Sequence, residues 1–439
     1  MKVIVIGGVA AGMSAAAKLK RLKKDVTIHV YEKGTDLSYG ACGMPYYLSD
    51  IIPDAKSLVA RTQEAFKKDG IEVFVNHEVV GVDPENKKVK IKHQNNMIED
   101  TYDKLIIATG AHAIRLPVPG SDLSGIHVLN SLEDAKNLKE ALQKAQTIGV
   151  IGAGFIGCEV AENLIHMKKN VIVIERLDQV LGIYDKDMSL HAQEALEQAG
   201  VDLKLSEDLI AYEGDTHVTH IKTNQNTYAV DLVIEAIGVR PNTSFLKDTN
   251  MKRLKNGAIV INEHMETSVK DIYAAGDCVA YQHQMTKASA YVPLGTHANK
   301  GGRVIASQIA GIDDEFQGII GSNVVKVMDL TVAKTGFTMK EVKAHNLNYQ
   351  YVDVTANNHA GYYPNAEKIH MRIVYEPKTL ILKGAQLIGK KGVSDRINVM
   401  AVAITNQMTA KAFSQLDLAY APPFSSVWDP LQIATNQII

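Results

Sequence analysis

Two stretches of the chain share one pattern of apolar and polar positions. Each begins with a short apolar run, continues through a glycine-rich turn and ends in apolar residues at helical spacing: KVIVIGGVAAGMSAAAKLKRL at the start and TIGVIGAGFIGCEVAENL from residue 147. A strand buried on both faces reads as a continuous apolar run, whereas recurrence every three to four residues indicates a helix. Each stretch therefore predicts a strand, a loop and a helix in that order.

The two glycine loops predict two dinucleotide sites. Glycine lets backbone amides approach a pyrophosphate at a helix N-terminus, where the helix dipole favours negative charge. The second loop fits GxGxxG fully, whereas in the first loop Val9 stands where the middle glycine often stands. The glycines concerned are Gly7, Gly8 and Gly12 in the first loop and Gly152, Gly154 and Gly157 in the second.

An acidic residue follows each loop at the distance that such a site requires. In a dinucleotide site, an acid about 20 residues after the loop binds the ribose hydroxyls. Glu32 in VTIHVYEK and Glu175 in VIVIERLD have this position. At the second loop an acid favours NADH over NADPH, although the neighbouring Arg176 leaves room for some NADPH use.

Composition narrows the class of protein. The 439 residues are 46% apolar and 22% charged, with a formal net charge of −2, which gives no support for bulk electrostatic binding to nucleic acid. No apolar run approaches the ~18 residues of a membrane span. Three scattered cysteines are too few for a disulfide framework and favour a reducing, cytoplasmic location. No metal-ligand spacing is present, so no metal is expected.

One cysteine stands apart from the other two. Cys42, in SYGACGMPYY, precedes a predicted helix that has Pro45 in its first turn. A helix N-terminus favours the thiolate form of cysteine, which is the nucleophilic form. Cys158 and Cys278 are expected to be buried apolar residues.

The motif TSVKDIYAAGDC resembles the second flavin motif of the FAD-dependent pyridine nucleotide-disulfide oxidoreductase family. By that resemblance Asp277, after Gly276, would hold the ribityl chain of FAD. YDKLIIATGA, which contains Thr109 and Gly110, and DLVIEAIGVRPN resemble the family's two crossovers between domains. The resemblance runs over the whole chain and implies FAD at the first glycine loop and NADH at the second.

The implied fold class is α/β, with two Rossmann-like dinucleotide-binding domains (FAD and NAD) and a C-terminal α+β dimerisation domain. The FAD domain is expected over 1–115 and 245–322, the NAD(P)H domain over 116–244 and the dimerisation domain over 323–439. The last segment alternates apolar and polar residues in NVVKVMDLTVAKTGFT and ends in helical patterns such as SDRINVMAVAITNQM. A homodimer that acts on a small-molecule disulfide or persulfide is expected.

The cysteine pattern indicates one branch of the resembling family. Glutathione-reductase-type members carry CxxxxC here, but this chain has Tyr47 at the second cysteine position, and the CxxC of thioredoxin reductases is absent. The single-cysteine branch contains coenzyme A disulfide reductases, persulfide or polysulfide reductases, NADH oxidases and NADH peroxidases. In this branch, the group bonded to the oxidised Cys42 sulfur comes from outside the chain. It is either a small-molecule thiol group, which gives a mixed disulfide, or oxygen, which gives a sulfenic acid.

Features within that branch favour a disulfide substrate. Peroxidases and water-forming oxidases carry a histidine in the first glycine loop, and this loop has none. Ser38 to Cys42 fits the Ser-aromatic-x-x-Cys pattern of coenzyme A disulfide reductases. That resemblance also implies two tyrosines from the other subunit, matched by Tyr362 and Tyr420, that donate a proton or a hydrogen bond to the leaving thiolate.

A helix face near the first loop is a candidate substrate site. Ser14, Lys18 and Arg21 fall at i, i+4 and i+7 and share one face, which could hold the phosphates of coenzyme A. The resemblance places substrate-binding residues at these positions, with Ser38. The alternative is a solvated basic helix end that complements the helix dipole.

Some positions depart from the coenzyme A reductase pattern. Trp428 replaces a basic residue that some members carry, and Asn299 replaces the family's histidine, with His297 in a shifted register. The SSVWDP ending resembles coenzyme A-stimulated sulfur and NADH oxidoreductases. The predicted function is NAD(P)H-dependent reduction of coenzyme A disulfide, or a related low-molecular-weight disulfide or persulfide, through a mixed disulfide at Cys42. The alternatives are a peroxide-forming NADH oxidase, a polysulfide or sulfur reductase, and a flavoprotein that recruits a partner.

Overall fold

The structure, a computed structural model, describes residues 1–439 and divides into two compact units. The first unit comprises Met1–Ile114, Val128–Glu140 and Gly238–Ile319. The second comprises Arg115–His127, Ala141–Ile237 and Ile320–Ile439. Among the helices of both units, none has the length and apolar character that crossing a bilayer requires.

The centre of the first unit is a five-stranded parallel sheet in the order β19-β7-β1-β2-β3. Its central strand β1 carries Val3, Ile4 and Val5, none of which is exposed, so the apolar run is buried on both faces as predicted. The strands are β1 (Lys2–Ile6), β2 (Thr27–Tyr31), β3 (Glu72–Phe74), β7 (Lys104–Ile107) and β19 (Ile272–Ala274).

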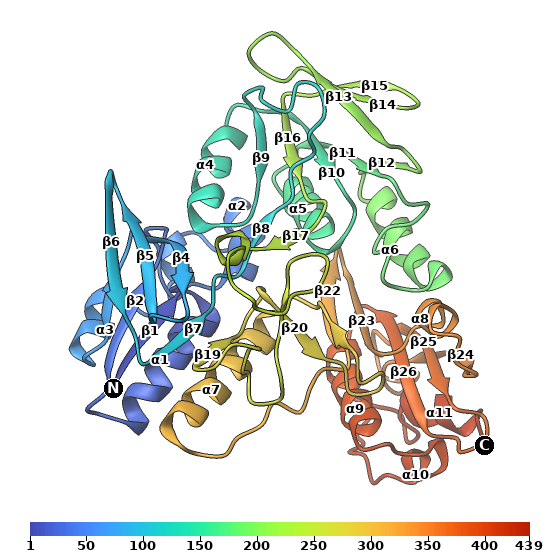
Figure 1. The fold of residues 1–439 in the computed structure, drawn as a ribbon. Coiled ribbons are helices and arrows are strands. Elements are labelled where there is room, and N and C mark those ends of the chain that lie inside the picture. The colour runs from blue at the N-terminus through green and yellow to red at the C-terminus, as the bar shows by residue number, and fades with distance from the viewer. The chain divides into compact units, whose positions relative to one another are not determined.

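Two helices that lie far apart in the sequence pack side by side against this sheet (Figure 1). They are α1 (Ala10–Leu22), which follows the first glycine loop, and α7 (Gly295–Ala310). A Cβ at Gly302 of α7 would lie 2.2 Å from the carbonyl oxygen of Ala11, so the close approach of the two helices requires glycine there. This packing joins the N-terminal segment of the unit to its late segment.

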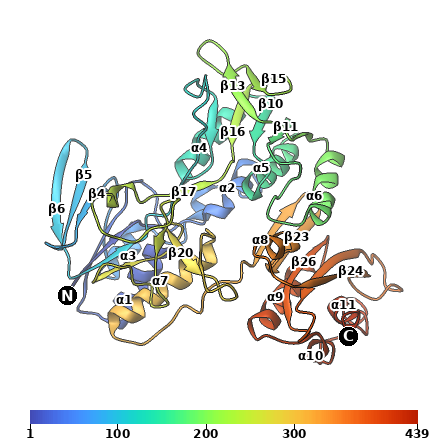
Figure 2. The same cartoon turned by 45° about the vertical axis from the view of Figure 1, so that its right-hand side comes forward.

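Smaller elements complete the first unit. The antiparallel strands β4-β5-β6 form a separate ribbon (Figure 2), and a second small sheet has the order β18-β20-β21. The residue ranges are β4 (Glu78–Asp83), β5 (Lys88–His93), β6 (Asn96–Thr101), β8 (Ala111–Ala113), β17 (Val239–Pro241), β18 (Ile259–Val260), β20 (Val279–Gln282), β21 (Ser289–Ala290), α2 (Met44–Leu48), α3 (Gln63–Lys68), the 3₁₀ turns η1 (Ala41–Gly43), η2 (Ala55–Leu58) and η3 (Ser244–Leu246), and α4 (Leu132–Leu142), which belongs to this unit up to Glu140.

The second unit repeats the same strand arrangement. Its parallel sheet has the order β12-β11-β10-β16-β9, with β10 taking the place of β1 and an antiparallel ribbon, β13-β14-β15, taking the place of β4-β5-β6. The ranges are β9 (Ile126–Val128), β10 (Thr147–Ile151), β11 (Asn170–Glu175), β12 (Asp202–Leu205), β13 (Leu209–Glu213), β14 (His220–Thr223), β15 (Thr227–Ala229), β16 (Leu232–Glu235), α5 (Phe155–His166) and α6 (Lys186–Gln198). The two predicted Rossmann-like domains are therefore present.

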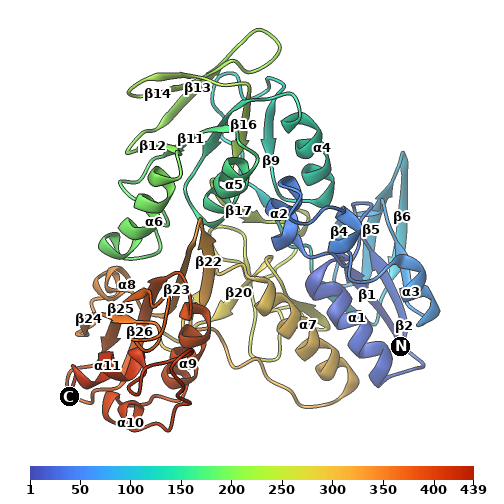
Figure 3. The ribbon, with the colours of Figure 1, turned by 180° about the vertical axis from the view of Figure 1, so that it is seen from behind.

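The C-terminal part of the second unit is a five-stranded antiparallel sheet in the order β22-β23-β26-β25-β24. Helices α9 and α11 pack against its strands (Figure 3), which gives the α+β architecture expected for this segment. The ranges are β22 (Asn323–Val327), β23 (Leu330–Gly336), β24 (Gln350–Asn357), β25 (Lys368–Tyr375), β26 (Leu382–Gly389), α8 (Met339–Ala344), α9 (Val393–Thr405), α10 (Ala410–Ser414) and α11 (Pro430–Asn436).

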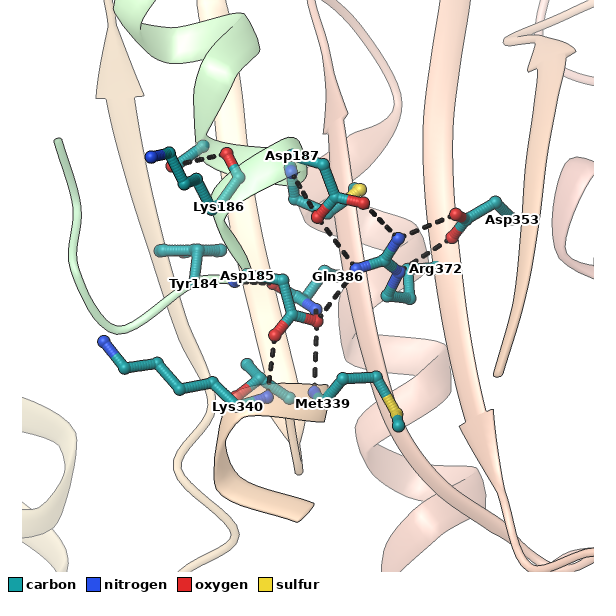
Figure 4. Close-up of polar contacts among 12 residues, drawn as sticks. Tyr184, Asp185, Lys186, Asp187, Met339, Lys340, Asp353, Arg372 and Gln386 are labelled. Atoms are coloured by element: carbon teal, nitrogen blue, oxygen red, sulfur yellow. Dashed lines mark hydrogen bonds and ion pairs between the residues drawn. The ribbon is translucent and has the colours of Figure 1, made fainter. Parts of the chain in front are cut away.

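A buried polar cluster joins the Rossmann-like part of the second unit to this antiparallel sheet (Figure 4). Asp185, before α6, accepts hydrogen bonds from the backbone N–H groups of Met339 and Lys340 at 3.0 and 2.8 Å and from Gln386 Nε2 at 2.6 Å. Arg372 of β25 pairs with Asp185 at 3.2 Å. The Asp185 carboxylate of the Rossmann-like part thus caps helix α8 and pairs with Arg372 of the antiparallel sheet.

Candidate active site

The first glycine loop is shaped by contacts that exclude any side chain. Gly7 has φ +106°, and a Cβ there would lie 2.2 Å from the carbonyl oxygen of Ala108. A Cβ at Gly12 would lie 2.0 Å from the carbonyl oxygen of Gly7. The loop therefore turns tightly between β1 and α1 and leaves its amides close to the helix N-terminus.

The second glycine loop is built in the same way. Gly152 has φ +98°, and a Cβ at Gly157 would lie 1.9 Å from the carbonyl oxygen of Gly152. Gly154, the N-cap of α5, has no neighbouring atom within 4 Å of the position a Cβ would take. The space before this helix N-terminus is open, and both loops fit the pyrophosphate of a dinucleotide.

The two acidic residues make equivalent contacts in the two compact units. Glu32 accepts hydrogen bonds from the N–H groups of Gly8 and Gly34, both at 2.7 Å. Glu175 accepts hydrogen bonds from the N–H groups of Ala153 and Leu177, at 2.7 and 2.8 Å. Each carboxylate is thus fixed beside its own glycine loop, which fits the ribose-binding role predicted for it.

The two predicted crossovers pair with each other. Strands β8 and β17 are antiparallel neighbours, the Thr109 hydroxyl donates to the Asn242 carbonyl at 2.7 Å, and the Asn242 N–H donates to the Gly110 carbonyl at 3.0 Å. The predicted flavin-motif residues follow β19. Gly276 has φ +90°, and burial raises the pKa of the half-buried Asp277 carboxyl.

Cys42 lies on a segment that is tied to the first glycine loop. Its 3₁₀ turn, η1, leads directly into α2, with Pro45 in the first turn as predicted. The N–H group of Ser38 donates to the carbonyl of Gly8 at 2.9 Å, and that of Gly40 donates to the carbonyl of Leu58 at 2.8 Å. Ser38 has φ +46°, a left-handed conformation that costs energy for a residue with a side chain.

The three cysteines differ in exposure in the predicted way. Cys42 is exposed, whereas Cys158 and Cys278 are buried. Burial raises the pKa of Cys158, and it raises the pKa of Cys278 to about 11. The two buried thiols are therefore poor nucleophiles at neutral pH, and Cys42 is the cysteine that a solute can reach.

The position of a second cysteine in CxxxxC enzymes holds an aromatic ring. The Lys139 ammonium lies 3.9 Å from the centre of the Tyr47 ring, and it donates a hydrogen bond to the carbonyl of Tyr47 at 2.7 Å. Tyr39 is partly buried, and burial, with a contribution from Glu32, raises its pKa to about 12.

The three helix residues assigned to substrate phosphates have different surroundings. Lys18 donates to the Ser307 hydroxyl at 2.5 Å and pairs with Asp314 at 3.3 Å, whereas Arg21 is exposed. The Ser14 hydroxyl donates to Asn299 Oδ1 at 2.5 Å. The helix face is therefore partly engaged by α7 and the segment after it.

The histidine in the shifted register is a core residue. His297 is 7% exposed, packs edge-on against Tyr281, and its Nδ1 lies 3.1 Å from the carbonyl oxygen of Val292. Burial lowers the pKa of His297. Burial thus disfavours the charged form of His297, while Asn299 lies at the surface beside Ser14.

The two predicted tyrosines are brought together. The hydroxyl oxygens of Tyr362 and Tyr420 lie 3.1 Å apart, and both side chains are exposed. The hydrogen bond with Tyr362 raises the pKa of Tyr420. Exposed apolar side chains follow Tyr420 in the chain, at Phe424, Val427 and Trp428.

A carboxylate with a perturbed pKa that the sequence does not single out is Glu159, in α5 directly after the second glycine motif. Burial, with a contribution from Glu162, raises the pKa of Glu159 to about 7. The glycine motif predicts the helix, but no residue pattern indicates that the partly buried Glu159 lies near the buried carboxylate of Glu162.

Glu159 makes stability depend on pH in a definite direction. Because the raised pKa means that folding favours the protonated form, its contribution is most favourable below its ordinary value of 4.5 and is lost as the pH rises through about 7. We expect Glu159→Gln to match the parent at pH 4 and to exceed it by roughly 1–2 kcal/mol in free energy of unfolding at pH 8, allowing for partial exposure. Urea denaturation at both pH values measures this, and a gain that is equal at pH 4 and pH 8 contradicts it.

Two family models match this chain, and they identify the class of enzyme that carries two nucleotide loops and an exposed cysteine. Residues 1–295 match the pyridine nucleotide-disulphide oxidoreductase family, and residues 322–431 match the dimerisation domain of pyridine nucleotide-disulphide oxidoreductases. The chain belongs to the pyridine nucleotide-disulphide oxidoreductase family. The predicted family, fold class and oxidoreductase activity are confirmed, and the family implies FAD and NAD(P)H as cofactors.

Particular relatives are similar over the whole chain. A coenzyme A disulfide reductase of Staphylococcus aureus is 34% identical over 430 residues, which cover 97% of this chain and 96% of the relative. Among solved structures, reduced Bacillus anthracis CoADR-RHD has a TM-score of 0.97 and 34% identity over 100% of this chain and 80% of its own. An NAD-dependent persulfide reductase from A. fulgidus has a TM-score of 0.97 and 36% identity over 100% and 82%, respectively. A water-forming NADH oxidase from Lactobacillus brevis has a TM-score of 0.96 and 31% identity over 100% and 98%.

Proposed function

We propose that this protein uses NAD(P)H to reduce coenzyme A disulfide, or a related low-molecular-weight disulfide or persulfide, through a mixed disulfide at Cys42. The observation that carries the proposal is a single exposed cysteine on a segment hydrogen-bonded to the first glycine loop, with Tyr47 where a second cysteine would stand. The similarity to coenzyme A disulfide reductases supports it.

In this proposal, each of the two glycine loops binds one dinucleotide. Segments 1–115 and 245–322 hold FAD, with Gly7, Gly8, Gly12, Glu32, Thr109, Gly110, Gly276 and Asp277 as contacts. Segment 116–244 binds NADH through Gly152, Gly154, Gly157 and Glu175, and segment 323–439 pairs two subunits. When bound, FAD would accept the hydride of NADH and pass on the two electrons that reduce the mixed disulfide at Cys42. The low cysteine content favours a cytoplasmic site of action.

The chain's own residues carry the sulfur chemistry. The Cys42 thiolate bonds to one sulfur of the substrate disulfide, whose S–S bond breaks and releases the first thiolate. Two electrons from NADH then cleave the mixed disulfide, which releases the second thiolate and restores the Cys42 thiolate. Tyr420 of the partner subunit, hydrogen-bonded to Tyr362 of the partner subunit, donates a proton or a hydrogen bond to the leaving sulfur. One disulfide consumes one NADH and yields two thiols.

Substrate recognition is assigned to the N-terminal helix face and to Ser38. Arg21 is exposed and is placed to meet phosphate groups of coenzyme A directly. Lys18 already neutralises Asp314, so its contribution requires that this pair open or be shared. Ser14 on α1, and Ser38, whose N–H group is hydrogen-bonded to the carbonyl of Gly8, each supply a hydroxyl group.

An anaerobic assay tests the proposal. With coenzyme A disulfide as the oxidant, we expect NADH oxidation and release of two thiols per NADH. Turnover with polysulfide but not with coenzyme A disulfide would favour the persulfide chemistry that the A. fulgidus relative's name describes. NADH oxidation that requires oxygen and releases no thiol would contradict the proposal and indicate an oxidase.

The second loop allows a prediction about nucleotide preference. The Glu175 carboxylate would repel a 2′-phosphate, whereas the exposed Arg176 beside it could pair with one. We expect Glu175→Ala to raise kcat/KM for NADPH relative to NADH by roughly 10-fold or more, which corresponds to one lost charge repulsion of about 1.4 kcal/mol. Steady-state kinetics with both nucleotides measures the ratio, and Arg176→Ala is the matched control, expected to move the ratio toward NADH. An unchanged ratio in Glu175→Ala contradicts the assignment.

A further inference from the structure

The two active-site tyrosines are held together although solvent surrounds them. Tyr362 is 77% exposed and Tyr420 is 45% exposed, yet their hydroxyl oxygens are only 3.1 Å apart. They lie on two separate segments, residues 358–367 between β24 and β25 and residues 420–429 before α11, here called the first and second tyrosine loops. An exposed hydrogen bond contributes little by itself, so other contacts must fix the two loops.

Arg396 is placed to do so. It lies in the first turn of α9, is 8% exposed, and its guanidinium reaches both loops. It donates to the carbonyl of Asn358 in the first loop at 2.9 Å, and its Nε and Nη2 lie 3.0 and 2.9 Å from the Asp429 carboxylate in the second. Its Nη1 donates to the Gly392 carbonyl at 3.0 Å, which holds the guanidinium against its own helix.

The partners of Arg396 are themselves the anchors of the loops. Asn358 closes the first tyrosine loop, because its N–H donates to the carbonyl of Glu367 at 2.8 Å and its side-chain oxygen accepts from the N–H of Glu367 at 3.0 Å. Asp429 caps α11 through the N–H of Leu431 at 2.9 Å and accepts from the Ser425 hydroxyl at 3.0 Å. Moving the guanidinium would therefore release an anchor in each loop.

The residue type matters as much as the position. A guanidinium presents several donors in a fixed plane, so it can serve a carbonyl and a carboxylate on different segments at once, whereas an ammonium acts as a point charge. The Asp429 side chain is 12% exposed and that of Arg396 is 9% exposed, so neither is compensated by bulk water. One backbone hydrogen bond, from Ala360 to Pro422 at 3.3 Å, also joins the loops.

We propose that Arg396 is a positioning residue that locks the two tyrosine loops together and so sets the contact between the Tyr362 and Tyr420 hydroxyls. This inference rests on the proposed function for the role of the tyrosines, but the contact itself can be measured without any turnover. Loss of Arg396 separates the phenols, so that Tyr420 loses the neighbour that perturbs its ionisation.

The test uses the full-length protein labelled with ¹³Cζ-tyrosine, in which the Tyr420 signal is identified by its loss in Tyr420→Phe. In the parent we expect Tyr420 to titrate above its ordinary pKa of about 10, and Tyr362→Phe to bring it back toward that value. Arg396→Met is expected to reproduce the effect of Tyr362→Phe. In the anaerobic disulfide assay it should lower kcat by roughly 10-fold or more, with KM for NADH unchanged, because the loss is one of proton donation.

Arg396→Lys provides a second variant that keeps the charge. Arg372→Lys is its matched control, since Arg372 is a buried arginine of the antiparallel sheet on which α9 packs, and its carboxylate partners lie outside the tyrosine loops. We expect Arg396→Lys to shift the Tyr420 titration in the same direction as Arg396→Met and Arg372→Lys to leave it unchanged. A parent-like Tyr420 titration in both Arg396 variants overturns the inference. Absence of disulfide turnover in the parent protein would overturn the proposed function instead, while leaving the titration result valid.

Discussion

Replacing Cys42 with serine is expected to lower disulfide reductase activity by roughly a thousand-fold or more, the scale seen when a catalytic nucleophile is removed. A serine hydroxyl cannot form the S–S bond of the mixed disulfide, and no other cysteine is exposed to replace it. The measurement is anaerobic NADH consumption with coenzyme A disulfide, with thiols counted in parallel.

Cys158→Ala is the matched control, because that thiol is buried in α5 and is expected to keep activity within a few-fold. Measuring the flavin absorption of each variant checks that loss of cofactor is not the cause of a lower activity. Slow NADH oxidation by oxygen should persist in Cys42→Ser, since it needs no thiol. Full disulfide reductase activity in Cys42→Ser would contradict the proposed mechanism.

Removal of Arg372 is expected to cause the largest loss of stability. Its side chain is 5% exposed and it balances three carboxylates, of which Asp185 is buried and Asp187 and Asp353 are 63% and 52% exposed (Figure 4). Taking away one partner of a buried ion pair leaves an uncompensated charge, so we expect Arg372→Met to lower the free energy of unfolding by about 3–5 kcal/mol.

The exposed carboxylates supply the controls for this prediction. Asp353→Asn and Asp187→Asn should each change the free energy of unfolding by less than about 1 kcal/mol, because solvent screens exposed pairs. Urea denaturation of the three variants gives the comparison. Equal losses for Arg372→Met and Asp353→Asn would contradict the view that the buried Asp185–Arg372 pair carries the cluster.

The sequence predicts those parts of the structure that depend on short-range patterns, namely apolar runs and glycine positions. The apolar runs around Val5 and Val150 mark central strands, and glycine is required wherever a Cβ would meet backbone, as at Gly12 and Gly157. The acids Glu32 and Glu175 follow because strand and helix lengths fix their distance from the loops. The two glycine loops and their acidic residues can therefore be predicted from the spacing of residues along the chain.

The remainder depends on contacts between distant segments. The sequence predicts that Lys18 faces solvent or substrate, but its ammonium contacts Ser307 and Asp314, which lie almost 300 positions further along the chain. Arg396 in SDRINVMAVAITNQM reads only as one residue of a helix, since nothing nearby indicates that Asp429 will lie against it. The raised pKa of Glu159 likewise comes from burial, which is a property of the folded state.

The most direct test of the central claim is to trap the mixed disulfide. The protein is reduced with a thiol reductant, which is then removed under anaerobic conditions. It is mixed with one equivalent of coenzyme A disulfide in the absence of NADH. Intact mass, peptide mapping and a count of released thiols identify the products. The account predicts one coenzyme A attached to Cys42 for each thiol released, with no adduct in Cys42→Ser. Absence of an adduct, or an equal adduct in Cys42→Ser, would contradict it.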